Sequence, residues 1–269
     1  MSPKRHEVIG IKQVVRREWY DFALDRLISG DSTAAIRAGL DEFISERLQS
    51  GGYGERGDQT YTKAVTQIMR SWVTPGNDLV PFRDAALDHA RSADRFERVV
   101  LHWAVTIAAY PFWHRVAVVV GRLLNLQEAV SQSQIRQRCY EAFGERTTIE
   151  RSARRVIRSF VTWGLLDDSE TKGMYRRSAP VVVTNHDLAA LLIEGVLLAI
   201  PEGRAPQSQV LSNPGLYPFQ LPSMNGGMIA ARSERIDVGR FSLDDELLRL
   251  RHSGACAVRG TQSRLVPEC

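Results

Sequence analysis

The chain of 269 residues is poor in the residues that build metal sites and disulfide frameworks. Its three cysteines, Cys139, Cys256 and Cys269, are an odd number and have no metal-ligand spacing. The six histidines are scattered, without cysteine or carboxylate partners at ligand spacing. We therefore expect no metal site, and we expect the protein to be cytoplasmic, where thiols stay reduced.

Motifs for nucleotide binding or nucleophilic catalysis are also missing. Four glycines lie within residues 50–58, but no Gly-Lys-Ser/Thr motif follows and no strand precedes them, so we expect a plain loop. The chain has neither a nucleophile elbow nor a Rossmann fingerprint, and Glu234 and Asp237 lack the lysine and strand context of a nuclease. We therefore expect a protein that is not an enzyme, binds no cofactor and takes no small-molecule substrate.

Long apolar runs are absent as well. An apolar run without Asp, Glu, Lys or Arg covers residues 99–114, contains His102 and Pro111, and is shorter than the ~20 residues that span a bilayer. The charged residues 4–7 are not followed by the apolar core of a signal peptide. The sequence therefore predicts no membrane partner and a buried helix at 99–114.

Basic residues are in excess in one part of the chain. The formal net charge is +4, and residues 134–177 hold 10 Lys or Arg against 6 Asp or Glu, which accounts for that excess. The rest of the chain is balanced. A local basic excess is typical of a surface that contacts nucleic acid.

Residues 147–163, inside this basic region, have the pattern of an amphipathic helix. Apolar residues recur at steps of three and four from Ile149 to Trp163, so at about 100° per residue they share one face. Thr147, with Glu150 three residues later, predicts a capping box at the start of the helix. The opposite face carries four arginines: Arg151, Arg154, Arg155 and Arg158.

Another helix is predicted directly before this one. Ser131 and Gln134 form a second capping-box pattern, and Gly144 follows the apolar stripe at the place of a left-handed helix-ending residue. Only two residues separate Gly144 from Thr147. So short a connection forces the two helices to cross sharply, as in a helix-turn-helix.

A β-hairpin with a charged tip is predicted after the second helix. Residues 167–173 have the composition of a turn, while 174–177 and 181–183 have that of strands. Helix, tight turn, helix and hairpin is the order of a winged helix-turn-helix, which binds double-stranded DNA. The predicted DNA-binding residues are Thr147, Thr148, Arg151, Ser152, Arg154, Arg155, Arg158, Lys172, Arg176 and Arg177.

These residues are expected to make different contacts. The arginines of 147–163 can pair with guanine edges in the major groove. The two threonines and Ser152, near the positive end of the helix dipole, suit phosphate oxygens. The three basic hairpin residues would reach the backbone or the minor groove. Two alternatives stay open: the arginines form an ordinary solvated helix face, or the winged helix is a protein–protein adaptor that does not bind DNA.

The chain as a whole is predicted to be mostly α-helical. Apolar residues at helical spacing fill its first hundred residues, and prolines and glycines gather in residues 201–227. We expect four parts: an all-helical bundle at 1–105, the winged helix-turn-helix at 106–200, an irregular docking segment with a short hairpin at 201–250, and a disordered tail at 251–269. Within the third part, the hairpin is expected from residues 228–231 and 235–241, and a last helix from Ser242 to Leu250.

Short runs at packing and helix-turn-helix positions lie between residues 110 and 219, within a resemblance that covers residues 10–250. They are Tyr110-Pro111-Phe112, Val120-Gly121-Arg122-Leu123-Leu124, Ile135-Arg136-Gln137-Arg138, Gly144-Glu145-Arg146-Thr147-Thr148, Ala153-Arg154-Arg155-Val156, Trp163-Gly164-Leu165-Leu166 and Leu216-Tyr217-Pro218-Phe219. Together they resemble the BrxA family, the small accessory proteins of BREX phage-resistance systems. The resemblance implies a helical DNA-binding protein without enzymatic activity, which works beside methyltransferase and ATPase components of a defence island.

Overall fold

The computed structural model describes residues 5–45 and 58–251 and is mostly helical, with small sheets. The predicted loop at 50–58 lies outside the described residues except for Asp58, and the predicted tail lies outside them except for Arg251. The mostly helical fold class is therefore confirmed.

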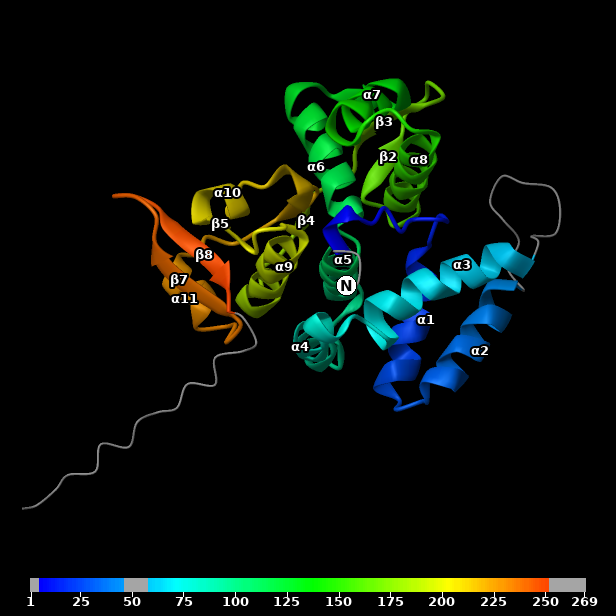
Figure 1. Ribbon diagram of the computed structural model, residues 1–269, viewed down its shortest axis with the longest axis horizontal. Helices are drawn as coiled ribbons and strands as arrows, with labels where there is room; N and C mark the ends of the chain where they lie inside the picture. The colour runs from blue at the N-terminus through cyan, green and yellow to red at the C-terminus, as the bar shows by residue number, and fades with distance from the viewer. Residues whose placement is uncertain (1–4, 46–57, 252–269) are drawn as a thin grey trace, which may run out of the picture.

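The elements follow one another along the chain in this order (Figure 1). The α-helices are α1 (Arg17–Ile28), α2 (Thr33–Ser45), α3 (Asp58–Ile68), α4 (Val80–Ala90), α5 (Arg95–Ala109), α6 (Pro111–Leu126), α7 (Gln132–Phe143), α8 (Thr147–Thr162), α9 (His186–Ala199), α10 (Gln207–Leu211) and α11 (Gly226–Ala230). Short helical turns are η1 (Arg5–Glu7), η2 (Met69–Val73), η3 (Asn77–Leu79) and η4 (Pro214–Leu216). The strands are β1 (Ala129–Ser131), β2 (Leu166–Asp168), β3 (Met174–Arg177), β4 (Val181–Val182), β5 (Arg204–Pro206), β6 (Phe219–Gln220), β7 (Ile236–Arg240) and β8 (Glu246–Leu250).

The first four helices pack with η2 beside α5, as the apolar spacing of their residues predicts. A buried polar link joins three of these elements. Trp72 Nε1 in η2 donates to His102 Nδ1 in α5 at 2.9 Å, and His102 Nε2 lies 3.0 Å from Asp21 Oδ1 in α1. Because Nδ1 accepts, the ring proton sits on Nε2 and is donated to the carboxylate. His102 is thus a satisfied core histidine.

Helices α5 and α9 form the centre of the molecule (Figure 1). Asp94 starts α5 with a complete capping box, and Asn185 caps α9. A cluster of buried rings joins α5 to α6 and α8: Trp103, Trp113, Phe160 and Trp163. The sequence-based boundary between residues 105 and 106 therefore falls inside α5, next to this shared core.

The middle of the chain builds a compact unit from α6, α7, α8 and a three-stranded antiparallel sheet. Pro111 occupies the first turn of α6, where its missing N–H costs nothing. The strand order is β1-β3-β2, with Val130 opposite Tyr175 and Asp168 opposite Tyr175 on the other side. Both Val130 and Tyr175 are buried, so the sheet rests on the same core as the helices.

The C-terminal part contains an antiparallel hairpin, but not the predicted one. Its strands are β7 and β8, joined by β5 on the other edge of β8. The expected first strand at 228–231 is mainly the helix α11, which Asn225 caps through the Met228 N–H, and the expected last helix at 242–250 is mainly strand β8. Contacts with the rest of the fold determine the structure of these short segments. Leu248 of β8 is buried in the core, and buried Glu194 of α9 binds the Arg235 guanidinium just before β7.

Within the described residues, no single helix is long and apolar enough to cross a membrane. Helices α5 and α6 are long and apolar enough only when taken together, and the chain bends by 115° between them, at Tyr110.

Candidate nucleic-acid interface

The start and end of α7 follow the sequence prediction. Ser131 Oγ accepts the Gln134 N–H at 3.1 Å, and Gln134 Oε1 accepts the Ser131 N–H at 2.8 Å, which completes the capping box. Gly144 ends the helix with φ of +83°, a conformation that side chains with a Cβ rarely adopt. On the inner face, Cys139 is buried, and burial raises the pKa of its thiol to about 12.

The predicted capping box at the start of α8 is wrong. Thr147 is already the first helical residue, and Arg146 occupies the N-cap position without a side-chain hydrogen bond. The Glu150 carboxylate turns instead to α7, where it accepts from Tyr140 Oη at 2.9 Å and lies 3.5 Å from Arg136. These two contacts lower the pKa of Glu150 and link the two helices. Exposed Thr147 and Thr148 keep their hydroxyls at the surface.

The predicted apolar face of α8 is confirmed as buried. Its residues are Ile149, Ala153, Val156, Ile157 and Phe160, continued by Trp163. Gly164 closes the helix with φ of +72°, and the Leu165 N–H donates back to the Phe160 carbonyl at 2.9 Å. This face fixes which residues of α8 point outward.

A second face of α8 is covered by the N-terminal segment 11–15, which the sequence did not predict. Ser152 Oγ donates to the Ile11 carbonyl at 2.9 Å, and Ser159 Oγ accepts the Val15 N–H at 3.0 Å. Trp163 Nε1 donates to the Val15 carbonyl at 3.1 Å. Ser152 is therefore buried, and its prediction as a DNA-binding residue is a mistake. A serine facing a chain segment about 140 residues away leaves no local sequence signal.

The four arginines of α8 are not equivalent. Arg151 and Arg154 are exposed, and neither forms a hydrogen bond or ion pair within the described chain. Arg155 is half-buried, and burial together with the neighbouring charges of Arg154 and Arg151 lowers its pKa. Arg158 is also half-buried and pairs with Asp168 of β2 at 2.5 Å. Two free guanidiniums thus stand at the N-terminal half of the helix.

The hairpin after α8 exists, but its strands differ from those predicted. It consists of β2 and β3, with residues 169–173 as its turn, whereas Val181–Val182 leaves the hairpin and pairs with Phe219–Gln220 as the parallel strands β4 and β6. Asp167 and Asp168 are residue types typical of a turn, but both belong to strand β2, which pairs with β3 at the edge of the sheet. Strand β1, which is too short to be predicted from its sequence, completes the sheet.

The basic residues of the hairpin lie at the surface. Lys172, at the turn, and Arg176, in β3, are exposed and have no hydrogen bond or ion pair within the described part of the chain. Arg177 is exposed as well but is turned toward α6, because it donates to Asn125 Oδ1 at 2.5 Å and lies over the Tyr217 ring. It is thus held away from the other two basic side chains.

Four cationic side chains among the ten predicted site residues are exposed and form no hydrogen bond or ion pair within the described residues: Arg151 and Arg154 on α8, and Lys172 and Arg176 on the hairpin. Arg155 is also unpaired there, but it is half-buried. Arg158 and Arg177 are held by neighbours, and Ser152 is buried. In residues 5–45 and 58–251, no group of three or more His, Cys, Asp or Glu side chains could hold a metal ion. Comparison of the chain with protein-family models, with curated proteins and with solved structures gave no match.

Proposed function

We propose that the protein binds double-stranded DNA, with α8 entering the major groove. The observation that carries this proposal is the pair of exposed guanidiniums of Arg151 and Arg154, neither of which forms an ion pair within the described residues, although the charge of Arg154 helps to lower the pKa of Glu150. Unpaired arginines on the exposed face of a helix are suited to guanine edges and to phosphate oxygens.

The order of the surrounding elements supports assignment of a winged helix-turn-helix. Helix α6 is followed by β1, the crossed pair α7 and α8, and the hairpin of β2 and β3, and the sheet order is β1-β3-β2. In this geometry α8 is the recognition helix and the hairpin is the wing. Lys172 and Arg176 would then contact the DNA backbone beside the groove.

The remaining predicted residues take supporting roles in this proposal. Thr147 and Thr148 lie in the first turn of α8, where hydroxyls and free backbone N–H groups attract phosphate. Arg155 is half-buried and lies on α8 between Ser152 and Ser159, which face the N-terminal segment. Arg158 and Arg177 would hold the wing against α8 and α6 rather than bind DNA themselves.

For the biological role, we propose a non-catalytic accessory protein of a bacterial phage-defence system, which acts beside other proteins of that system. This part rests on the resemblance of the sequence runs to the BrxA family. The short runs Ala153-Arg154-Arg155-Val156 and Trp163-Gly164-Leu165-Leu166, which carry the resemblance, lie on and directly after α8.

The test is DNA affinity, measured by fluorescence anisotropy on a labelled duplex. Arg151→Ala/Arg154→Ala should keep the fold, because both side chains are exposed and alanine favours helix. Affinity should fall at least tenfold, which corresponds to about 1.4 kcal/mol. The matched control is Arg91→Ala/Arg95→Ala, which removes the same charge from exposed positions around the start of α5 and should change affinity little.

A protein–protein adaptor is the second candidate function, and one surface favours it. Phe96 is 72% exposed and Val182 is 63% exposed, and both line a pocket at the start of α5. Exposed apolar residues gathered in one place suit a protein partner. Under this alternative, the Arg151/Arg154 variant would bind DNA as the parent protein does, or neither would bind.

A further inference from the structure

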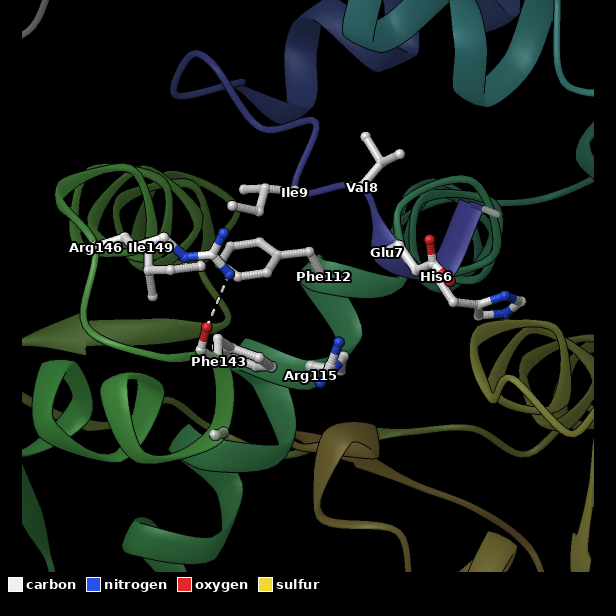
Figure 2. Close-up of a pocket in the computed structure, with 10 residues that line it drawn as sticks. His6, Glu7, Val8, Ile9, Phe112, Arg115, Phe143, Arg146 and Ile149 are labelled. Carbon is white, nitrogen blue, oxygen red and sulfur yellow. Dashed lines mark hydrogen bonds between the residues drawn. The ribbon is translucent and has the colours of Figure 1, made fainter. Parts of the chain in front are cut away.

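A pocket lies beneath the connection between α7 and α8, away from the exposed face of α8. Its volume is about 280 Å³, and it is enclosed by the N-terminal segment, the start of α6, the end of α7 and the start of α8 (Figure 2). Six of its ten lining residues are apolar, and the other four are charged or titratable. The apolar lining residues are Val8, Ile9, Phe112, Ala142, Phe143 and Ile149.

Two guanidiniums line this pocket from different elements. The Arg115 guanidinium of α6 lies over the Phe143 ring at 4.2 Å from its centroid, and partial burial lowers the pKa of Arg115. Arg146, the N-cap residue of α8, donates to the Phe143 carbonyl at 3.1 Å and reaches toward Phe112 (Figure 2). Both arginines are exposed and neither forms an ion pair within the described residues, so two positive charges lie at the rim of this pocket.

The other titratable residues around the pocket do not neutralise these charges. Glu7 is exposed and lies at the N-terminal end of the pocket, and it makes no ion pair in the part of the chain that the structure describes. The His6 ring is turned away, because its Nε2 lies 3.0 Å from the Leu198 carbonyl of α9. Burial lowers the pKa of His6, which disfavours a third positive charge.

We propose that this pocket binds a small organic anion with an aromatic body, a carboxylate or phosphate monoester held by Arg115 and Arg146. Guanidiniums match the paired oxygens of such anions, and the rings of Phe112 and Phe143, which pack against each other with centroids 5.3 Å apart, would lie beside the ligand ring. The volume suits a ligand of about one ring with its acid group, at the lower end of ordinary small-molecule sites. This proposal does not depend on DNA binding.

The test uses four probes and the full-length chain: benzoate and phenyl phosphate as the two anion types, benzyl alcohol as the uncharged analogue, and inorganic phosphate as the anion without a ring. Binding is followed by isothermal titration calorimetry and ligand-observed NMR. At least one of the two aromatic anions should bind saturably with a dissociation constant of about 1 mM or tighter, as expected of so small a ligand. Benzyl alcohol and inorganic phosphate should bind at least tenfold more weakly.

Variants assign the binding to this pocket. Arg115→Gln and Arg146→Gln should each weaken binding of the aromatic anion at least fivefold, and the double variant should abolish it. Arg138→Gln, an exposed arginine of α7 outside the pocket, is the control and should bind as the parent does. Thermal melts check that each variant is folded. The proposal is overturned if neither aromatic anion binds below about 10 mM, if inorganic phosphate binds equally well, or if the folded double variant retains full affinity.

Discussion

At the scale of single residues, Arg151 and Ser152 are adjacent in sequence but lie on different faces of α8. Arg151 is exposed, whereas Ser152 is 2% exposed and bonded to the Ile11 carbonyl. Helical periodicity alone predicts that both residues are exposed, because it does not show which polar positions another segment of the chain covers. The N-terminal segment therefore decides which side chains of α8 stay available to a ligand.

Removal of the Ser152 hydroxyl should affect stability rather than DNA binding. Ser152→Ala leaves the buried Ile11 carbonyl without its donor, which should lower the free energy of unfolding by about 1–3 kcal/mol. Urea denaturation checks this value, with Ser133→Ala, an exposed position in α7, as the control. DNA affinity of the folded Ser152→Ala protein should equal that of the parent. A tenfold loss of DNA affinity without loss of stability would show that Ser152 contacts DNA.

At the scale of elements, the packing of α6 against η4 should make stability depend on pH. His114 of α6 is buried with Nε2 3.2 Å from Asn213 Oδ1, and burial lowers its pKa to about 4 from its ordinary value of 6.5. Between these two pH values the unfolded chain binds a proton that the folded chain does not, so stability falls as pH is lowered through this window. The difference amounts to at most about 3 kcal/mol.

The comparison that isolates this effect is between the parent protein and His114→Gln, measured by urea denaturation at pH 7 and pH 4.5. Glutamine can still donate to Asn213 but takes up no proton, so the variant should lose less stability on acidification. Burial also lowers the pKa of His102, which both proteins retain, so some dependence on pH should remain. Equal losses of stability on acidification in the two proteins would rule out His114 as a source of the pH dependence.

The same contact between α6 and η4 allows a steric test. A Cβ added to Gly121 would lie 2.0 Å from the Pro214 carbonyl oxygen, so the two elements would have to separate. Alanine normally stabilises a helix by about 1 kcal/mol relative to glycine. Here we expect the opposite sign, a loss of about 1–3 kcal/mol seen as a lower melting temperature. In Gly39→Ala of α2, the new Cβ would meet only the Phe22 ring at 3.3 Å, so a smaller effect is expected; an equal loss would argue against the clash.

Long elements with a strong local pattern could be predicted from the sequence, whereas short elements could not. The capping box of Ser131 and the apolar face of α8 are local features, and both are present as predicted. Strand β1 and the partner of Val181–Val182 depend on segments far away in the chain, and β8 pairs with distant β5 as well as with neighbouring β7. Likewise, exposure of Arg151 followed from its helix face, while the burial of Ser152 and the Arg158–Asp168 pair required the fold.

At the scale of the whole molecule, the unit of α6 to β3 shares its core with the rest of the chain. Trp103 of α5 contacts the rings of Trp113 and Phe160, and residues 11–15 cover one flank of α8. A fragment of residues 106–200 loses both, so we expect it to lack a cooperative thermal transition by circular dichroism and tryptophan fluorescence. A transition as sharp as that of the full chain would show that this unit is an independent domain.

The central claim is that the exposed arginines of α8 contact DNA, and the salt dependence of binding tests it most directly. The logarithm of the association constant should fall linearly with the logarithm of salt concentration for the parent and for the Arg91/Arg95 control. In Arg151→Ala/Arg154→Ala the slope should be smaller by about 0.9 for each lost phosphate contact. Where an arginine reads a base instead, the line should shift to weaker binding by roughly 1–3 kcal/mol without that change in slope. A well-folded variant whose line overlays that of the parent at every salt concentration would contradict the claim.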